Sequence, residues 1–266
     1  MLNGIGFSET ALTVLFVLIF FGSESLPKIL KDLGRFYSRL RKYYLEIRNT
    51  IMSEYDKKEN KPAKENAHST LKNAKQRIRM EILKKRNSIR PDRILQYSRE
   101  ISSSILALSE YSKAEVVYIY LSKDSEVVSD FIIEKSLSDG KIISVPKCRP
   151  PYSMEFYPVK NCFTDTKTGY MGIREPHNIK QGPCVYPPDI IIIPGIAYDY
   201  KRNRIGYGKG YFDRYLDRIK ANASSLIIAP AFDEQIYPYE LPCDEKDRKP
   251  DIIITPSQVI GGKIET

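Results

Sequence analysis

Four consecutive isoleucines, Ile190 to Ile193, place the strongest constraint on the fold of this chain. They are all β-branched, and the run is bounded by Pro187-Pro188-Asp189 and by Pro194-Gly195, so it is predicted to be a strand. Side chains alternate between the two faces of a sheet, so a strand without polar residues is typical of one buried on both faces. The run therefore predicts the central strand of a parallel sheet.

The segments around this strand alternate between helix and strand patterns. Helices are predicted at residues 71–86 and 91–108, near 128–137 and near 211–220, and strands at 116–121, 141–145, 154–159, 226–229 and 252–255. Such alternation predicts an α/β fold, a mostly parallel sheet with helices on both faces in a Rossmann-like three-layer arrangement. Ligands in such folds bind beyond the carboxyl ends of the strands.

The first 70 residues follow a different pattern. Residues 11–21 are apolar except for Thr13, which fits a buried helix, a signal peptide or a short membrane helix. Residues 28–48 carry seven basic side chains and apolar residues at three- and four-residue steps, which is typical of an amphipathic helix on an anionic membrane or of a soluble packed helix. We expect a single-pass anchor in residues 1–52, membrane contact through residues 5–50, and a polar linker at 53–70. The positive-inside rule places the remaining residues in the cytoplasm.

The front end resembles the A/B-type subunits of the twin-arginine translocase. The segment Gly4-Ile5-Gly6-Phe7-Ser8-Glu9, the apolar run, Phe21-Gly22 and the basic helix carry this resemblance over residues 1–50. It implies a short membrane helix, a glycine hinge and translocase subunits as possible partners. The hinge reads Gly22-Ser23, whereas the family usually has Gly-Pro.

Charge and cysteine content restrict the classes of ligand. The net charge of +9 is spread along the chain, which favours an anionic partner such as a nucleotide or phospholipid head groups. The chain has no arginine-rich tail of the kind that would predict nucleic-acid binding. The four cysteines form no CxxC pair, and the chain has two histidines, so we expect reduced thiols and no Cys/His zinc site.

A glycine-rich loop follows the isoleucine strand. Gly206, Gly208 and Gly210 alternate within it, beside Arg204 and Lys209 and just before the next helix. Such a loop is either structural or a phosphate cradle, and the two cations favour the cradle. Asp213 then either holds Mg²⁺ against phosphates or is a favourable charge at a helix N-terminus.

Two further groups of residues carry chemistry. Lys75, Arg79 and Arg86 fall on one stripe of the first helix, where they either reach a phosphate site or snorkel from a packed helix. Glu126 follows a predicted strand and is either a hydrogen-bond acceptor for a substrate or a solvated loop acid.

Together these motifs resemble the 5-formyltetrahydrofolate cyclo-ligase family over residues 71–266. The matching segments are Lys75 to Arg79, Leu121-Ser122 with Glu126, residues 172–176, residues 194–216 and residues 241–247. The resemblance implies an enzyme that uses ATP and Mg²⁺ to convert 5-formyltetrahydrofolate to 5,10-methenyltetrahydrofolate, with ADP and phosphate released. It implies that the formyl oxygen is phosphorylated before N10 closes the ring.

The resemblance also implies roles for individual residues. Contacts to ATP would come from Lys75, Arg79, Arg204, Ile205, Gly206, Tyr207, Gly208, Lys209, Gly210, Tyr211 and Phe212. Contacts to the folate would come from Leu121, Glu126, Tyr207, Gly208, Lys209, Gly210 and Tyr211, and Mg²⁺ would be held by Asp213 and Asp247. The catalytic residues would be Lys209, Arg204 and Tyr211. Members often have an aromatic residue where this chain has Met171, and Tyr170 precedes it.

The leading hypothesis is therefore a cytoplasm-facing folate enzyme on a membrane anchor. The rival hypothesis is a translocase component that carries the enzyme domain as a passenger. Two further alternatives are a chance fusion with an idle anchor and a nucleotide-binding module that turns over no folate.

Overall fold

The computed structural model describes residues 63–149, 151, 153–169, 172–177, 179–219 and 225–262. The chain divides into two compact units, Met1–Asn66 and Ala67–Thr266. The predicted anchor and residues 53–62 of the predicted linker lie outside the described residues. Within the described ranges, no helix combines the length and the apolar character that crossing a membrane requires.

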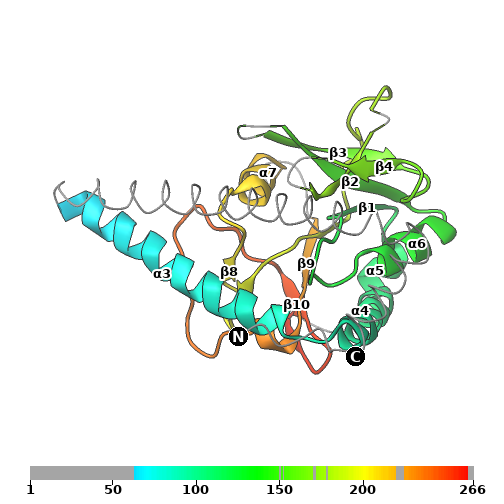
Figure 1. Ribbon diagram of the computed structural model, residues 1–266. Coiled ribbons are helices and arrows are strands. Elements are labelled where there is room, and N and C mark those ends of the chain that lie inside the picture. Colours follow the sequence, from blue (N-terminus) through cyan, green and yellow to red (C-terminus); the bar gives the residue numbers. More distant parts are fainter. Residues whose placement is uncertain are drawn as a thin grey trace, which may run out of the picture. The chain divides into compact units, whose positions relative to one another are not determined.

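A seven-stranded sheet forms the centre of the second unit (Figure 1). Its order is β11-β10-β9-β6-β1-β2-β3. The bounds are β1 Val116–Ile119, β2 Ile142–Arg149, β3 Ser153–Val159, β6 Ile190–Ile192, β9 Leu226–Pro230, β10 Ile252–Ile254 and β11 Val259–Gly261.

The pairing confirms the predicted mostly parallel sheet. Strands β10, β9, β6, β1 and β2 pair in parallel, and the two edge strands, β11 and β3, pair antiparallel with their neighbours. The isoleucine strand β6 lies in the middle, with Ile191 opposite Tyr118 of β1 and Ile227 of β9. All three residues of β6 are fully or almost fully buried, as a central strand requires.

Helices cover both faces of the sheet, also as predicted. On one face, Val117 and Ile192 pack with Ile101 of α4 and Ile133 of α6. On the other face, Tyr118, Ile191 and Ile253 pack with Tyr215 and Leu216 of α7. Figure 1 shows α4, α5 and α6 grouped on their side, away from α7. The bounds are α4 Pro91–Leu106, α5 Ser109–Lys113, α6 Asp130–Ser138 and α7 Tyr211–Ile219.

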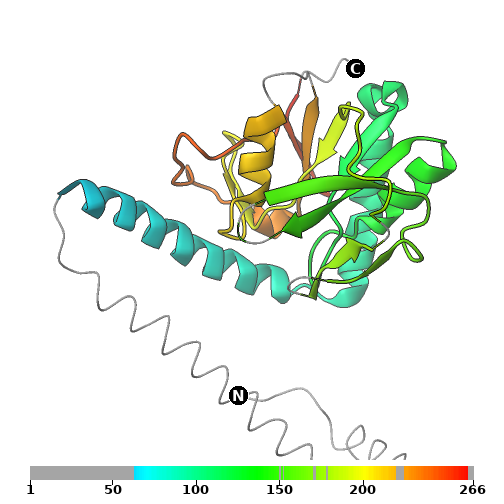
Figure 2. The same cartoon turned by 90° about the horizontal axis from the view of Figure 1, so that it is seen from above.

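Helix α3 spans Ala63–Asn87 and begins eight residues before the predicted start at Leu71. Residues 63–70, expected in the linker, are therefore helical, and their alanines, lysine and glutamate favour a helix. In Figures 1 and 2 the second half of α3 runs past the strands after β6. There Ile82 packs with Ile196, Ile205 and Leu241 in a small third cluster.

Seven short elements were not predicted. They are the hairpin β4 Thr166–Thr168 with β5 Arg174–Pro176, the hairpin β7 Ala197–Tyr198 with β8 Arg204–Ile205, the 3-10 helix Asp233–Gln235, the edge strand β11 and the helix α5. The predicted 91–108 helix is α4, which ends two residues earlier, at Leu106. Elements of two to five residues carry too little hydrophobic period to be recognised in a sequence.

The two edges of the sheet are short or covered. Edge strand β11 has three residues and ends at Gly261, where an added Cβ would lie 2.5 Å from the backbone oxygen of Asp251. Edge strand β3 contains Pro158, and its Phe156 carbonyl accepts a hydrogen bond from the N–H of Cys184, at 2.8 Å. Neither edge presents a long run of open backbone groups.

Candidate functional site

The glycine loop lies at the carboxyl end of β6, where the sequence predicts it, but a hairpin precedes it. After β6 the chain forms β7 and β8 and then continues through residues 206–210 into α7. The turn between β7 and β8 is organised by the buried Asp199. Its carboxylate accepts hydrogen bonds from the N–H groups of Lys201, Asn203 and Leu241, at 2.9, 2.8 and 2.7 Å. These bonds fix where the glycine loop starts.

The loop itself presents backbone donors. Gly208 and Gly210 have φ values of +89° and +64°, which side chains rarely permit. The N–H groups of residues 206–210 donate to no other described residue. Lys209 is exposed, and no ion pair joins its ammonium to the described part of the chain. Open N–H groups beside a cation and a helix N-terminus are suited to an anion such as phosphate.

Arg204 is buried under this loop. Its guanidinium bonds to the Asp213 carboxylate and donates to the carbonyls of Pro194 and Arg248, at 3.0 and 3.3 Å. The N–H of Arg248 donates to the same Asp213 oxygen at 3.1 Å. One side chain thus joins the end of β6, the start of α7 and the loop before β10.

Lys75 makes a second ion cluster, with the 241–249 loop. Its ammonium contacts Asp247 and lies 3.0 Å from Asp244 Oδ2. The N–H of Asp244 donates to Asp247 at 2.8 Å, which fixes that carboxylate. Burial lowers the pKa of Lys75, but the hydrogen bonds and charges of the two aspartates outweigh burial, so the pKa lies above its ordinary value.

The two predicted metal ligands are connected through the backbone of Arg248. Asp213 is bonded to the N–H of Arg248, the residue that follows Asp247. Magnesium in proteins is commonly held by one or two carboxylates plus substrate phosphates, and this pair fits that pattern. Among the residues that the structure describes, no group of three or more His, Cys, Asp or Glu side chains forms a metal centre. An ion here would therefore depend on phosphate oxygens for further ligands.

Arg79 connects α3 to the glycine loop. Its Nε donates to the carbonyl of Gly206 at 2.9 Å, and a Cβ on Gly208 would lie 3.6 Å from its guanidinium. The predicted stripe on α3 is therefore real, and its members contact three different loops. Lys75 contacts the 241–249 loop, Arg79 contacts the glycine loop, and Arg86 contacts Ser125 and Tyr207.

Glu126 is buried rather than solvated. It is 8% exposed, and its carboxylate accepts hydrogen bonds from the Tyr207 hydroxyl and, at 2.8 Å, from the N–H of Lys123. Burial raises the pKa of Glu126 above its ordinary value, although the two hydrogen bonds and the Arg86 charge oppose that shift. A buried acceptor of this kind is suited to N–H groups of a ligand.

The other predicted site residues contribute in different ways. Leu121 and Ile205 are buried core residues, and the Phe212 ring packs against Phe156 with centroids 6.3 Å apart, so these three side chains belong to the core. The Tyr211 hydroxyl donates to the Pro151 carbonyl at 3.3 Å. Tyr170 and Met171 lie outside the described residues.

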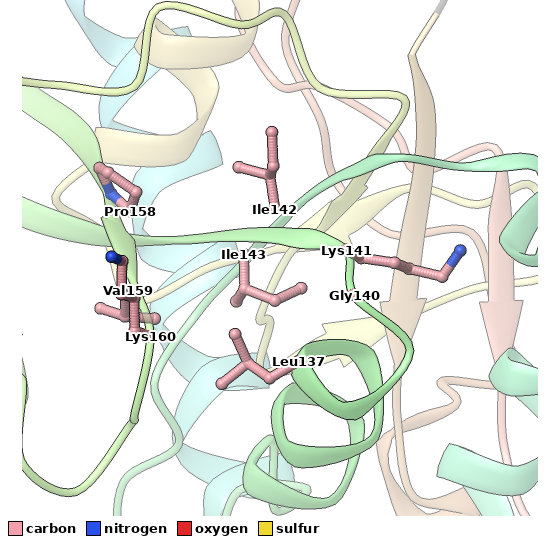
Figure 3. A pocket seen from close by; sticks show the side chains of 8 residues that line it. All are labelled: Leu137, Gly140, Lys141, Ile142, Ile143, Pro158, Val159 and Lys160. Atoms are coloured by element: carbon pink, nitrogen blue, oxygen red, sulfur yellow. The ribbon is translucent and has the colours of Figure 1, made fainter.

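A separate hollow of about 350 Å³ lies at the opposite end of the sheet, and Figure 3 shows its lining. It sits where β2 begins and β3 ends, whereas ligands of parallel sheets bind at the carboxyl ends of the strands. Its walls are mainly apolar and include none of the predicted site residues: Leu137, Gly140, Lys141, Ile142, Ile143, Pro158, Val159 and Lys160. This hollow is therefore separate from the predicted site residues.

Sequence reasoning missed two residues of this region and the partner of a third. Asp199 shapes the loop and Asp244 pairs with Lys75, whereas Arg86, which the sequence places on the α3 stripe, contacts Tyr207. Asp199 and Asn203 are typical turn residues and could have revealed the hairpin. The other two contacts join residues more than 100 positions apart and leave no local signal.

Comparisons with known proteins identify relatives of this chain. Residues 71–256 match the 5-formyltetrahydrofolate cyclo-ligase family, and residues 3–50 match the mttA/Hcf106 family. The 5-formyltetrahydrofolate cyclo-ligase of Mus musculus is 29% identical over 198 residues, which cover 70% of this chain and 95% of the mouse protein. The enzyme of the same name from Saccharomyces cerevisiae is 25% identical over 202 residues, or 68% of this chain and 94% of that protein. Both predicted resemblances are confirmed.

Two solved structures share the fold. The NMR structure of Aquifex aeolicus 5,10-methenyltetrahydrofolate synthetase matches with a TM-score of 0.60 and 29% identity, over 70% of this chain and 91% of that one. The synthetase of Mycoplasma pneumoniae matches with a TM-score of 0.53 and 22% identity, over 68% of this chain and 98% of that one. At that identity the second likeness concerns the fold alone.

Arg204 should be required for stability as well as for the site. Arg204→Met removes one partner of a buried ion pair, so we expect it to lower the free energy of unfolding by about 3 kcal/mol in a urea titration. The matched control is Arg218→Met, which breaks an exposed pair with Glu155 and should cost about 0.5 kcal/mol. Equal losses in the two variants would contradict the role assigned to Arg204.

Proposed function

The chain belongs to the 5-formyltetrahydrofolate cyclo-ligase family, and we propose that it closes 5-formyltetrahydrofolate to 5,10-methenyltetrahydrofolate at the expense of ATP. The observation that carries the proposal is the glycine loop, whose N–H groups donate to no other described residue and whose Lys209 is exposed. Arg79 donates to the Gly206 carbonyl of this loop, and Asp213 lies in the first turn of the helix that follows it. Donors and cations for phosphate, carboxylates for a metal and the buried acceptor Glu126 then occur at one end of the sheet.

The proposed reaction has two stages. The formyl oxygen attacks the γ-phosphorus of ATP, and ADP leaves. N10 then attacks the formyl carbon and loses its proton, and the C–O bond breaks to release phosphate. The N–H groups of residues 206–210 and the Lys209 ammonium would stabilise charge on the transferring group, because phosphoryl transfer depends mainly on positioning and charge stabilisation.

The remaining residues would orient the two substrates. Arg79 fixes the glycine loop through the Gly206 carbonyl, and Arg204 fixes Asp213. Asp213 and Asp247 would hold Mg²⁺, which when bound supplies positive charge to the phosphate oxygens. Glu126 would accept hydrogen bonds from the N–H groups of the pterin ring. Tyr211, at the start of α7, would line the folate side of the loop.

We also propose that the first 52 residues tether this enzyme to the cytoplasmic membrane, with the enzyme domain in the cytoplasm. The match of residues 3–50 to the mttA/Hcf106 family supports the tether. The alternative function is a component of the twin-arginine translocation system that carries the enzyme as a passenger. The same match favours that alternative, so the two are separated by experiment.

The direct test of the proposed reaction follows the near-ultraviolet absorbance of the methenyl product. The purified chain receives 5-formyltetrahydrofolate and Mg²⁺, with and without ATP. ATP-dependent growth of the band supports the proposal. A flat trace from folded protein that binds ATP would favour a nucleotide-binding module without folate turnover.

Lys209→Ala should reduce turnover without affecting the fold. Loss of a preorganised charge contact costs about 2–4 kcal/mol of transition-state stabilisation, which lowers kcat/KM by about 30- to 1000-fold. The side chain is exposed, so the thermal midpoint should not change. The matched control is Lys113→Ala, at an exposed lysine in α5. Near-normal turnover would remove Lys209 from the phosphate cradle.

When the pH is lowered, activity with the folate should be lost at a higher pH than the pKa of an ordinary glutamate would give. Protonation removes the acceptor capacity of Glu126, and burial raises its pKa, so kcat/KM for the folate should fall as the pH drops through that raised pKa. Glu126→Gln should have low kcat/KM and no such acid limb. An unchanged acid limb in Glu126→Gln would assign the titration to another group.

The tether predicts that the full chain binds anionic vesicles and that a chain beginning at residue 63 does not. Cosedimentation measures binding, and the absorbance assay measures activity of both proteins. Equal vesicle binding would disprove the tether. If the chain instead restores export in a strain without the cognate translocase subunit, and Glu9→Ala abolishes that rescue, the translocase alternative is supported.

A further inference from the structure

Arg86 is a buried cation that the proposed reaction does not yet use. It lies in the last turn of α3 and is 3% exposed. Its Nε donates to Ser125 Oγ at 3.1 Å and its Nη1 donates to the Tyr207 hydroxyl at 3.0 Å. The guanidinium carbon also lies 5.8 Å from the centroid of the Tyr207 ring. One side chain therefore contacts the glycine loop through Tyr207 and the Glu126 loop through Ser125.

These contacts fix the direction of a hydrogen-bond chain. A guanidinium can only donate, so the Tyr207 oxygen must act as acceptor toward Arg86. The single hydroxyl proton of Tyr207 is then left for Glu126 Oε1, which it contacts. An ionised carboxylate can only accept, so each group donates to the next, from Arg86 to Tyr207 and from Tyr207 to Glu126.

We infer that Arg86 is a positioning residue, which acts through the Tyr207 hydroxyl to hold Glu126 ionised and aimed at the folate. This inference rests on the proposed function, in which Glu126 accepts the pterin N–H groups. It adds a link between the two substrates, because Tyr207 belongs to the loop that would cradle ATP. A cation on α3 thereby joins the two loops.

The surroundings of Glu126 explain why a positioning cation is required. The Glu126 carboxylate interacts electrostatically with the phenols of Tyr120, Tyr198 and Tyr207, and Asp124 lies on its own loop. Burial and the Asp124 charge favour the protonated acid, whereas Arg86 and the hydrogen bonds from Tyr207 and the Lys123 N–H favour the carboxylate. Removing Arg86 takes away both a positive charge and the group that orients Tyr207.

The test compares Arg86→Met, Arg86→Lys and the control Arg77→Met in the full chain. Arg77 is an exposed residue of the same helix. For Arg86→Met we expect KM for 5-formyltetrahydrofolate to rise about tenfold, the usual scale for a lost hydrogen bond to a charged group. We expect little change in kcat. Arg86→Lys keeps the charge but cannot donate to Ser125 and Tyr207 in the same fork geometry, so its KM should be intermediate.

A second readout does not depend on turnover. The Glu126 side-chain carboxyl carbon is followed by NMR across a pH titration. Arg86→Met should move its midpoint upward by about one pH unit, because an opposite charge nearby is lost. Arg86→Lys should move it less, and Arg77→Met should leave it unchanged. Tyr207→Phe should raise the midpoint, and adding Arg86→Met to it should raise the midpoint by less than the sum of the two changes.

The outcomes separate this inference from the proposed function. An unmoved Glu126 midpoint in Arg86→Met, or strictly additive effects with Tyr207→Phe, would overturn the inference whether or not the chain turns over folate. A wild-type chain without turnover but with the shifted midpoint would disprove the proposed function and retain the Arg86–Tyr207–Glu126 chain. If Arg86→Met does not fold, Arg86→Lys provides the test. An unchanged KM for 5-formyltetrahydrofolate and an unchanged Glu126 midpoint in that variant would show that Arg86 only packs, and would overturn the inference.

Discussion

The buried guanidinium of Arg204 makes the contacts on which the site depends. It is bonded to Asp213 at the start of α7, to the Pro194 carbonyl at the end of the central strand, and to the Arg248 carbonyl in the loop before β10. A buried cation is costly unless its donors are satisfied, so these three segments are held at the distances that satisfy it. The glycine loop spans the gap between β8 and α7, so Arg204 positions it together with Asp199 and Arg79.

A common pattern runs through the polar groups of the site. Each predicted metal carboxylate already has a cationic partner, since Asp213 is bonded to Arg204 and Asp247 to Lys75. The two carboxylates are therefore already held in place by cations when a ligand arrives, and Arg204 is itself fixed by two backbone carbonyls. Groups that are held in this way reduce the rearrangement that binding requires.

The sequence predicts the sheet well because its central strands are continuous apolar runs, and Ile190 to Ile193 mark the buried centre. It also predicts that Lys75, Arg79 and Arg86 share one face of a helix, because helical period is a local property. It does not predict their partners. Asp244, Gly206 and Tyr207 lie far away in the chain, and which loop meets which turn of α3 is decided by packing around Ile82. The hairpin β7–β8 was missed because two-residue strands are too short to show a hydrophobic period and depend on the hydrogen bonds of Asp199.

The blocked edges of the sheet have a consequence for many copies of the chain on one surface. Enzymes held on a membrane, as proposed here, meet their neighbours far more often than they would in free solution. Open strand edges under such crowding would add strand to strand and lead to aggregation. A three-residue strand at one side, and Pro158 with the Cys184 backbone at the other, give an approaching strand little to pair with. The fold is thus compatible with dense packing in two dimensions.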